Sequence, residues 1–254
     1  MFVIGLDIGS TTTKATVLTD EKEILSYEIV PTGANMVEAE KQVFYTVLEK
    51  ANLERNQIAN IVSSGYGRER SRFAKSQITE IKAMAIGAEY LFPGVKTLID
   101  VGGQDNKAIK IKGGKVQDFK LNDKCAAGTG RFLELISKVL EIPIEEMSNV
   151  AKKTRRFESL SKTCAVFAQT EVINLLSQGS SAAEIIQGSY EFIAKRVLSM
   201  ATSLRIEQPI VLSGGVAKSE SLVKMFNKIS GLKVEIPDEP QLIGSIGSAI
   251  HGLL

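Results

Sequence analysis

Short apolar runs separated by polar turns predict strands at the start of the chain. Residues 2–9, 13–20 and 23–30 are predicted as three consecutive strands, with a turn at residues 19–22 between the last two. Apolar positions at helical spacing predict a helix over 36–51, followed by a buried strand at 58–63 and a helix at 79–91. Pro93-Gly94 then interrupts the pattern, so we place a domain boundary there, with one half at 1–94 and the other at 95–254.

The same order of elements begins again after this break. Strands are predicted at 96–101, 106–112 and 115–121, with Gly113-Gly114 as a hairpin turn. Helices follow at 126–141, 144–152, 164–178 and 182–205, then a strand at 209–213, a helix at 218–230, a strand at 232–236 and a last helix from Ile243. The order βββαβα therefore occurs twice, with extra helices in the second copy, which predicts a duplicated α/β fold.

Each half has the same polar signature directly after its first strand. Asp7-Ile8-Gly9-Ser10-Thr11-Thr12-Thr13-Lys14 and Asp100-Val101-Gly102-Gly103-Gln104-Asp105-Asn106-Lys107 place Asp, Gly and Lys in phase, 93 residues apart (100 − 7, 102 − 9, 107 − 14). An ordinary hairpin rich in small residues is the alternative for either copy alone. The recurrence favours a pair of phosphate-binding turns.

Phosphate-binding turns need backbone N–H groups that point inward, close approach at glycine, and hydroxyl donors. The predicted phosphate-binding residues are Gly9, Ser10, Thr11, Thr12, Lys14, Gly102 and Gly103. A carboxylate beside a phosphate requires a cation between them, so Asp7 and Asp100 are predicted to hold Mg²⁺, directly or through water. Gly214-Gly215 follows another apolar strand and is predicted to contact adenosine. The Gly9–Lys14 turn lacks the second glycine of a Walker loop.

The chain has two cysteines, Cys125 and Cys164, each predicted just ahead of a helix. Unpaired N–H groups at a helix N-terminus favour the thiolate, which is the form that binds metal. Two cysteines cannot hold a four-ligand iron–sulfur cluster, but two chains related by a two-fold axis supply four. Burial as small apolar side chains is the alternative, and position alone favours it.

Composition narrows the class of protein. The 31 basic and 29 acidic residues give a net charge of +2, and no basic tract indicates nucleic acid or a membrane surface as a partner. No apolar run approaches the roughly 20 residues of a membrane span, and the N-terminus lacks the pattern of a signal peptide, so we expect a cytoplasmic protein. The only histidine, His251, makes a histidine-based triad or metal site improbable on sequence grounds.

The three glycine turns together resemble the phosphate-1, phosphate-2 and adenosine motifs of the actin, Hsp70 and sugar-kinase superfamily, over almost the whole chain. That resemblance implies a ribonuclease H-like, hexokinase-like fold of two domains, with the nucleotide cleft between the halves. Residues 7–14, 100–105, 122–134 and 164–168 also resemble the ATPase activators of 2-hydroxyacyl-CoA dehydratases and the benzoyl-CoA reductase ATPase subunits.

The second resemblance implies a homodimer in which Cys125 and Cys164 of each subunit bind one shared [4Fe–4S] cluster. It implies that a ferredoxin or flavodoxin reduces the cluster. ATP hydrolysis to ADP then drives a low-potential electron to an acceptor dehydratase or a related iron–sulfur reductase. The cofactors expected are the cluster, ATP or ADP, and Mg²⁺.

For hydrolysis, we expect Gln104 and Asp105 to orient or activate the attacking water, together with Asp7. Lys107 is either a phosphate contact or a solvated strand residue. Glu171, within the helix after Cys164, is either a polar contact near nucleotide or interface or a plain surface acid. A small-molecule kinase with Asp105 as its base is the alternative function, and an ATP-dependent sensor or chaperone-like module is disfavoured because no peptide-binding domain remains.

Overall fold

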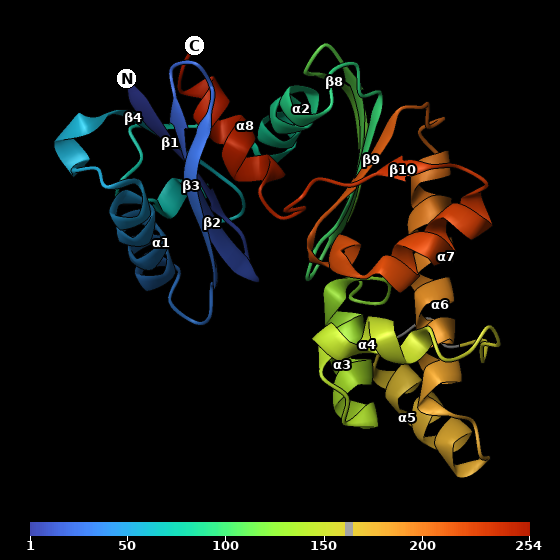
Figure 1. Ribbon diagram of the computed structural model, residues 1–254. Helices are drawn as coiled ribbons and strands as arrows, with labels where there is room; N and C mark the ends of the chain where they lie inside the picture. Colours follow the sequence, from blue (N-terminus) through green and yellow to red (C-terminus); the bar gives the residue numbers. More distant parts are fainter. Residues whose placement is uncertain (161–164) are drawn as a thin grey trace. The chain divides into compact units, whose positions relative to one another are not determined.

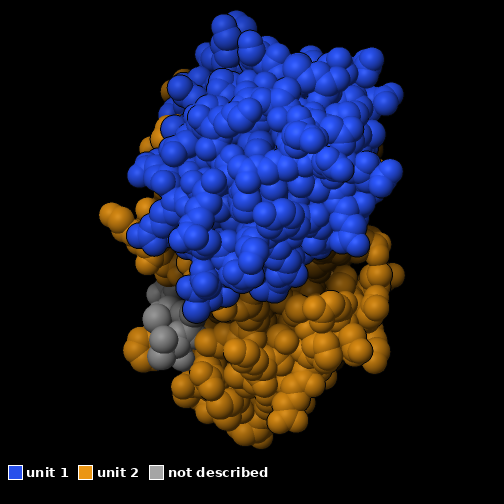
Figure 2. Space-filling model, turned by 90° about the vertical axis from the view of Figure 1, so that its left-hand side faces the viewer, with its two compact units in different colours: residues 1–96, 111–118, 241–254 blue, residues 97–110, 119–240 orange. Residues whose placement is uncertain are grey.

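The computed structural model describes residues 1–160 and 165–254, which form two compact units (Figures 1 and 2). Unit 1 comprises residues 1–96, 111–118 and 241–254, and unit 2 comprises residues 97–110 and 119–240. This grouping differs from a single cut at Pro93-Gly94, because the C-terminal residues pack with the N-terminal unit. The division of the sequence repeat into 1–94 and 95–254 stays a prediction, since the units describe packing and not the repeat.

The sheet of unit 1 has the strand order β3-β2-β1-β4-β5. Its strands are β1 (Phe2–Ile8), β2 (Thr12–Thr19), β3 (Ile24–Pro31), β4 (Ile58–Ser64) and the short β5 (Ser76–Gln77), which the sequence pattern did not indicate. The central strand β1 pairs antiparallel with β2 and parallel with β4. The polar turn after β1 and the end of β4 therefore lie at the same edge of the sheet.

Helices cover both faces of this sheet, as the alternation along β1 requires (Figure 1). Ile4, Leu6 and Ile8 pack with α1 (Met36–Ala51), whereas Val3 packs with α8 (Ile243–His251). Gly5 also faces α8, where a Cβ would collide with the backbone oxygen of Ser245. The C-terminal helix thus packs directly on the backbone of the first strand, beside α2 (Glu80–Leu91).

The second sheet repeats the first in topology. Its order is β10-β9-β6-β7-β8, with β6 (Thr97–Val101) central, antiparallel to β7 (Asn106–Lys112) and parallel to β9 (Ile210–Ser213). The outer strands are β8 (Lys115–Asn122) and β10 (Val234–Glu235). The predicted duplication is therefore present as two sheets with one connection scheme.

The helices of unit 2 pack around the long α6 (Ala182–Thr202), whose Tyr190, Ile193 and Val197 are buried. Ser181 caps this helix in a reciprocal pair with Glu184. The other helices are α3 (Gly130–Leu140), α4 (Ile144–Ala151), α5 (Ala165–Ser177) and α7 (Glu220–Ser230). None of the helices in the described part of the chain is both long and apolar enough to cross a membrane.

The prediction of a helix from residue 126 was wrong at its start. Residues 126–129 form a turn, in which the Thr129 hydroxyl donates to the Ala126 carbonyl at 2.7 Å. Gly128 has a φ of +93°, in the left-handed region that favours glycine, so the α-helix begins only at Gly130. Cys125 consequently lies in a loop and not at a helix N-terminus.

Candidate functional site

The first phosphate-type turn, in unit 1, presents free backbone donors. The Gly9 N–H donates to the Thr12 carbonyl at 3.1 Å and closes the turn, and within the described residues the N–H groups of Ser10 and Thr11 at its tip form no hydrogen bond. A Cβ at Gly9 would lie 2.7 Å from the Thr12 carbonyl oxygen, so the turn requires glycine there. Thr32 donates two hydrogen bonds to the turn. Its hydroxyl donates to the Gly9 carbonyl at 2.8 Å, and its N–H donates to the Thr11 carbonyl at 2.9 Å.

Asp7 and Lys14 face each other across β1 and β2 beside this turn. They are register partners, and Lys14 Nζ lies 3.0 Å from Asp7 Oδ2. The other carboxylate oxygen, Asp7 Oδ1, is buried and has no hydrogen-bond partner, and the same holds for the Thr11 hydroxyl. Two unpaired buried oxygens beside a turn of free N–H groups leave places for a cation, water or phosphate group to satisfy.

The second turn, in unit 2, repeats this geometry. The Gly102 N–H donates to the Asp105 carbonyl at 2.9 Å, while the N–H groups of Gly103 and Gln104 have no backbone partner in the described chain. A Cβ at Gly102 would lie 2.8 Å from the Asp105 carbonyl oxygen. The exposed Gln104 side chain is therefore at the tip of a turn with the same construction as the first.

Lys107 is buried and bridges two carboxylates. It is 3% exposed, with Nζ 2.8 Å from Asp105 Oδ2 and 3.5 Å from Asp100 Oδ2. The alternative that Lys107 is a solvated strand residue is therefore wrong. The Ser213 hydroxyl donates to Asp100 Oδ1 at 2.8 Å, so both oxygens of Asp100 have partners within the chain, unlike those of Asp7.

Each unit also has a Ser-Gly pair that abuts its aspartate. Ser64 is the parallel register partner of Asp7, as Ser213 is of Asp100. The glycines that follow, Gly65 and Gly214, both have a φ of +85°. A Cβ on Gly65 would lie 2.5 Å from Asp7 Oδ1, and one on Gly214 would lie 3.0 Å from Asp100 Oδ1.

The sequence pattern indicated Gly214-Gly215 but not Ser64 and Gly65, which are the counterparts of Ser213 and Gly214 in unit 1. The available signal was a Ser-Gly pair that follows the second parallel strand in both halves. Gly215 begins a 3₁₀ turn at Gly215–Lys218, and the Gly214 N–H donates to the Pro240 carbonyl at 3.0 Å. The predicted adenosine turn is thus next to Asp100, within unit 2.

The second phosphate-type turn is bonded to the start of α3, which directly follows the loop that holds Cys125. The Gly130 N–H donates to the Gly102 carbonyl at 2.9 Å, and the Arg131 N–H donates to the Gly103 carbonyl at 2.8 Å. The buried Asn106 adds a side-chain bond, from its Nδ2 to the Gly128 carbonyl at 2.9 Å. The loop and the start of α3 together therefore have three hydrogen bonds to the turn and the strand that follows it.

Cys125 is partly exposed and has a cationic neighbour. Arg196 Nη2 on α6 donates to Cys125 Sγ at 3.3 Å, and Asn122 Nδ2 donates to the Cys125 carbonyl at 3.3 Å. The positive charge beside this sulfur therefore comes from an arginine and not, as predicted, from a helix N-terminus. Cys164 lies outside the described residues, and Glu171 is half-buried on α5.

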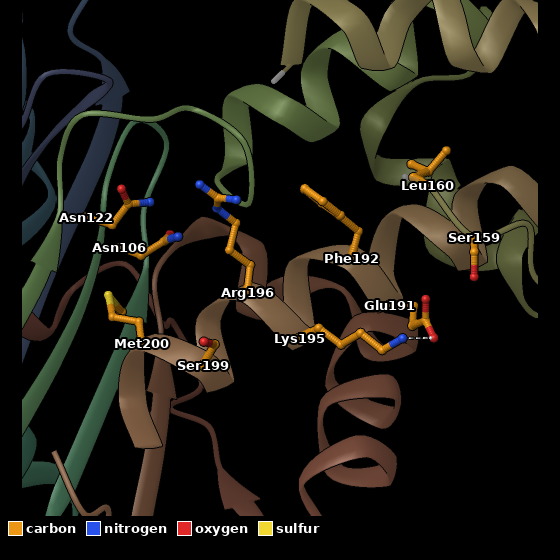
Figure 3. Close-up of a pocket in the computed structure, with 10 residues that line it drawn as sticks. All are labelled: Asn106, Asn122, Ser159, Leu160, Glu191, Phe192, Lys195, Arg196, Ser199 and Met200. Carbon is orange, nitrogen blue, oxygen red and sulfur yellow. Dashed lines mark ion pairs between the residues drawn. The ribbon is translucent and has the colours of Figure 1, made fainter. Parts of the chain in front are cut away.

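A cavity of about 690 Å³ lies beside Arg196 in unit 2 (Figure 3). Asn106 and Asn122 are at one side of the arginine, and Phe192 and Leu160 are at the other. The Oδ1 atom of Asn106 is buried without a partner. Neither Arg196 nor this cavity had a signal in the sequence, because α6 brings the arginine to a loop 71 residues earlier in the chain.

Comparison with known proteins gives one consistent result. The chain is 36% identical over 254 residues to the (R)-2-hydroxyglutaryl-CoA dehydratase activating ATPase of Acidaminococcus fermentans, covering 99% of this chain and 96% of that one. A solved structure, the activator of the 2-hydroxyisocaproyl-CoA dehydratase from Clostridium difficile with bound ADPNP, matches with a TM-score of 0.95 at 35% identity, covering 100% and 94% of the two chains.

More distant structures support the fold alone. A ROK family glucokinase from Streptomyces griseus matches with a TM-score of 0.62 at 17% identity, covering 99% of each chain. Together with the nearer matches, this confirms the predicted α/β fold class with two domains. The model of the BadF/BadG/BcrA/BcrD ATPase family matches residues 4–252. With its two phosphate-type turns and a relative that is 36% identical over almost its whole length, the chain belongs to the BadF/BadG/BcrA/BcrD ATPase family.

Proposed function

We propose that this chain is an ATP-hydrolysing activator that delivers a low-potential electron from a [4Fe–4S] cluster to an iron–sulfur dehydratase or reductase. The observation that carries the proposal is the pair of hydrogen bonds from the Gly102-Gly103 turn to the first two residues of α3, which directly follow the loop of Cys125. A turn that binds phosphate in one nucleotide state and not in another would move this loop. The relatives named as activators of dehydratases give the class of acceptor.

The nucleotide part of the proposal rests on the two turns. Their free N–H groups suit phosphate oxygens, and Gln104, which is exposed at the tip of the second turn, would orient an attacking water. Asp105 also remains a candidate for this role, although its Oδ2 is held by Lys107 at 2.8 Å. Gly214 and Gly215 would lie against adenosine.

Mg²⁺ fits the oxygens beside the first turn. It prefers hard oxygen ligands and is usually held by one or two carboxylates together with phosphate oxygens and waters. Asp7 Oδ1 is buried without a partner, which suits such an ion or its water. The described residues contain no group of three or more His, Cys, Asp or Glu side chains arranged to hold a metal alone. When bound, the ion would neutralise charge on the phosphates.

A shared cluster fits the surroundings of Cys125. Cys125 is partly exposed, which suits contact with a group outside the chain's own core. Ala126, Ala127 and Gly128 beside it carry little side chain, and Arg196 offers a cationic donor. A cluster needs four thiolates, so Cys125 and Cys164 of two subunits would supply them. When bound, the cluster supplies the one-electron chemistry.

A homodimer is consistent with the surface of α5, the helix that directly follows Cys164. Phe167 is 63% exposed and Ile173 is 51% exposed on this helix. Large apolar side chains that are exposed in one subunit are expected to be covered where two subunits meet. A ferredoxin or flavodoxin would serve as electron donor.

The mechanism we propose assigns three tasks to the chain itself. The turns bind and orient the phosphates, and Gln104 or Asp105 with Asp7 positions the attacking water. The hydrogen bonds from Gly130, Arg131 and Asn106 then convert a change at the Gly102-Gly103 turn into a displacement of the Cys125 loop. Such a displacement would change the hydrogen bonding and solvent exposure of the cluster, both of which tune its potential.

A small-molecule kinase is the second candidate, with Asp105 as the base. The matches to sugar kinases concern the fold alone. The ion pair with Lys107 occupies one oxygen of that carboxylate, which makes Asp105 less available to accept a proton from a substrate hydroxyl. The activator is therefore the better-supported function.

The test is anaerobic purification with measurement of iron, acid-labile sulfide and particle mass. We expect about four of each per dimer, and loss of both in Cys125→Ser and in Cys164→Ser, with ATP hydrolysis retained. A soluble, monomeric, iron-free protein that hydrolyses ATP would contradict the electron-transfer proposal and favour a search for a phosphoryl acceptor.

A further inference from the structure

Arg196 lies outside the predicted site, and its side chain donates a hydrogen bond to the sulfur of a predicted cluster ligand, Cys125. Its Nη2 donates to Cys125 Sγ at 3.3 Å from α6, a helix far from Cys125 in the sequence. The guanidinium is always charged and has five N–H donors, so the bond to sulfur is charge-assisted. We propose that Arg196 is a positioning residue that holds the Cys125 sulfur and sets the reduction potential of the cluster; this rests on the proposed function.

The loop residue Gly128 leaves room for the Arg196 side chain to reach the sulfur. Gly128 has a φ of +93°, and a Cβ there would lie 2.8 Å from Arg196 Cδ. The bare backbone of the loop therefore lets the arginine side chain pass beside it and reach the sulfur. Asn106 fixes this part of the loop by donating to the Gly128 carbonyl.

The two basic residues of α6, Lys195 and Arg196, have different partners. The adjacent Lys195 forms an ion pair with Glu191 at 2.7 Å and is 59% exposed (Figure 3). No ion pair to an Asp or Glu is recorded for Arg196 in the part of the chain that the structure describes. Its charge is thus directed at the sulfur and not neutralised by a carboxylate.

The direction of the effect follows from charge. A reduced cluster has one more negative charge than an oxidised one, so a cation and a hydrogen bond at a ligand sulfur stabilise the reduced form. Removing them lowers the potential. Because the cluster is shared, both subunits of the dimer would contribute one arginine each.

The test compares Arg196→Gln and Arg196→Lys with the control Lys195→Gln, using the anaerobically purified dimer with its iron. Lys195→Gln removes the same charge one residue away on the same helix without touching Cys125. The measurements are iron per dimer, the electron paramagnetic resonance spectrum of the reduced cluster, and its midpoint potential. We expect Arg196→Gln to lower the equilibrium constant for one-electron reduction by at least tenfold, or about 59 mV, with a smaller change in Arg196→Lys and the least in Lys195→Gln.

Gly128→Ala should also break the bond between Arg196 and the Cys125 sulfur, because the added Cβ would displace the arginine side chain without removing its charge. It should also lower the potential. Iron lost from Arg196→Gln but kept in Arg196→Lys, with a lowered potential in the latter, would support the proposal as well.

Two results would overturn it. If Arg196→Gln keeps its iron with the potential and spectrum of the wild type, Arg196 has no such role and the proposed function stands. If the wild type holds no iron and Cys125→Ser behaves identically, the proposed function fails and this inference fails with it.

Discussion

Replacing Asn106 by leucine should separate nucleotide binding from the response of the Cys125 loop. Asn106 is 1% exposed, and its Nδ2 donates to the Gly128 carbonyl at 2.9 Å. Leucine has a similar volume but no donor, so it leaves that buried carbonyl unpaired at a cost of about 1–3 kcal/mol. A free energy of this size corresponds to a change of roughly 5- to 150-fold in an equilibrium.

The assay is amide hydrogen exchange of residues 123–130, with and without ADPNP. In the wild type we expect the nucleotide to slow exchange in this loop, because its bonds to the Gly102-Gly103 turn transmit the ordering of that turn. In Asn106→Leu we expect roughly 5- to 150-fold faster exchange without nucleotide, and little further protection when ADPNP is added. Binding of ADPNP itself should change little.

Thr13 offers a matched control, because it is the counterpart of Asn106 in the first turn (106 − 13 = 93). Its hydroxyl pairs with that of Thr32 at 2.9 Å and has no recorded contact with the loop. Thr13→Val should therefore leave exchange at 123–130 unchanged. If Asn106→Leu binds ADPNP and shows the wild-type exchange pattern in both states, the coupling does not pass through this side chain.

Three further substitutions test the local physics. Gly214→Ala should lower the melting temperature more than Gly231→Ala. Both residues have positive φ, but only at Gly214 would a Cβ also collide with the Val101 carbonyl, so equal losses in thermal unfolding would refute the steric argument. The Glu40 carboxylate accepts from the Ser71 hydroxyl and from the Arg72 N–H at 3.0 Å. Glu40→Leu should lower the free energy of unfolding by about 1–3 kcal/mol for each donor left without an acceptor, and Glu40→Gln should lower it less, as measured by urea unfolding. Lys152 and Lys224 hold the pKa of Glu220 at about 2, below its ordinary 4.5, so its contribution to stability is present above pH 4.5 and is lost as pH falls through 2. The difference in free energy of unfolding between Glu220→Gln and wild type should be small, should decrease with added salt, and should disappear as pH falls from 4.5 to about 2. A difference independent of pH would contradict this.

The sequence predicted the fold where local pattern and tertiary packing agree. The alternating runs gave the central strands, and the repeated Asp-Gly-Lys spacing gave the two turns, because register places Asp7 opposite Lys14 and Asp100 opposite Lys107. The start of α3 was missed because Ala126 and Ala127 favour helix, whereas Gly128 in the left-handed region prevents it. The short β5 was missed because two exposed residues produce no hydrophobic pattern.

The parts of the site that could not be predicted are those made by distant segments. Arg196 contacts Cys125, and Ser213 donates to Asp100 across a parallel strand pair. Neither contact leaves a periodic or spaced signal in one sequence, since each depends on how helices and strands pack. The packing of α8 on β1 is of the same kind, and it is the reason the compact units do not follow the order of the chain.

The aspartates of the two signatures differ in whether both carboxylate oxygens have a partner within the described chain. In the second copy, Lys107 and Ser213 occupy both oxygens of Asp100, whereas in the first copy Asp7 Oδ1 has no partner. We therefore expect Asp7 to be the carboxylate on which Mg²⁺-dependent nucleotide binding relies, and Asp100 to stabilise unit 2.

Asp7→Asn should remove most of the difference in ADPNP affinity between buffers with Mg²⁺ and with EDTA, and should reduce ATP hydrolysis by more than about tenfold, the equivalent of 1.4 kcal/mol. Asp100→Asn should keep that Mg²⁺ dependence and lower the free energy of unfolding by about 1–3 kcal/mol, because the buried Lys107 ammonium loses the negative charge of one neighbouring carboxylate. Titration calorimetry and urea unfolding of both variants measure the two effects. If Asp100→Asn loses the Mg²⁺ dependence to the same extent as Asp7→Asn, the free oxygen does not distinguish the copies, and both aspartates serve the cation.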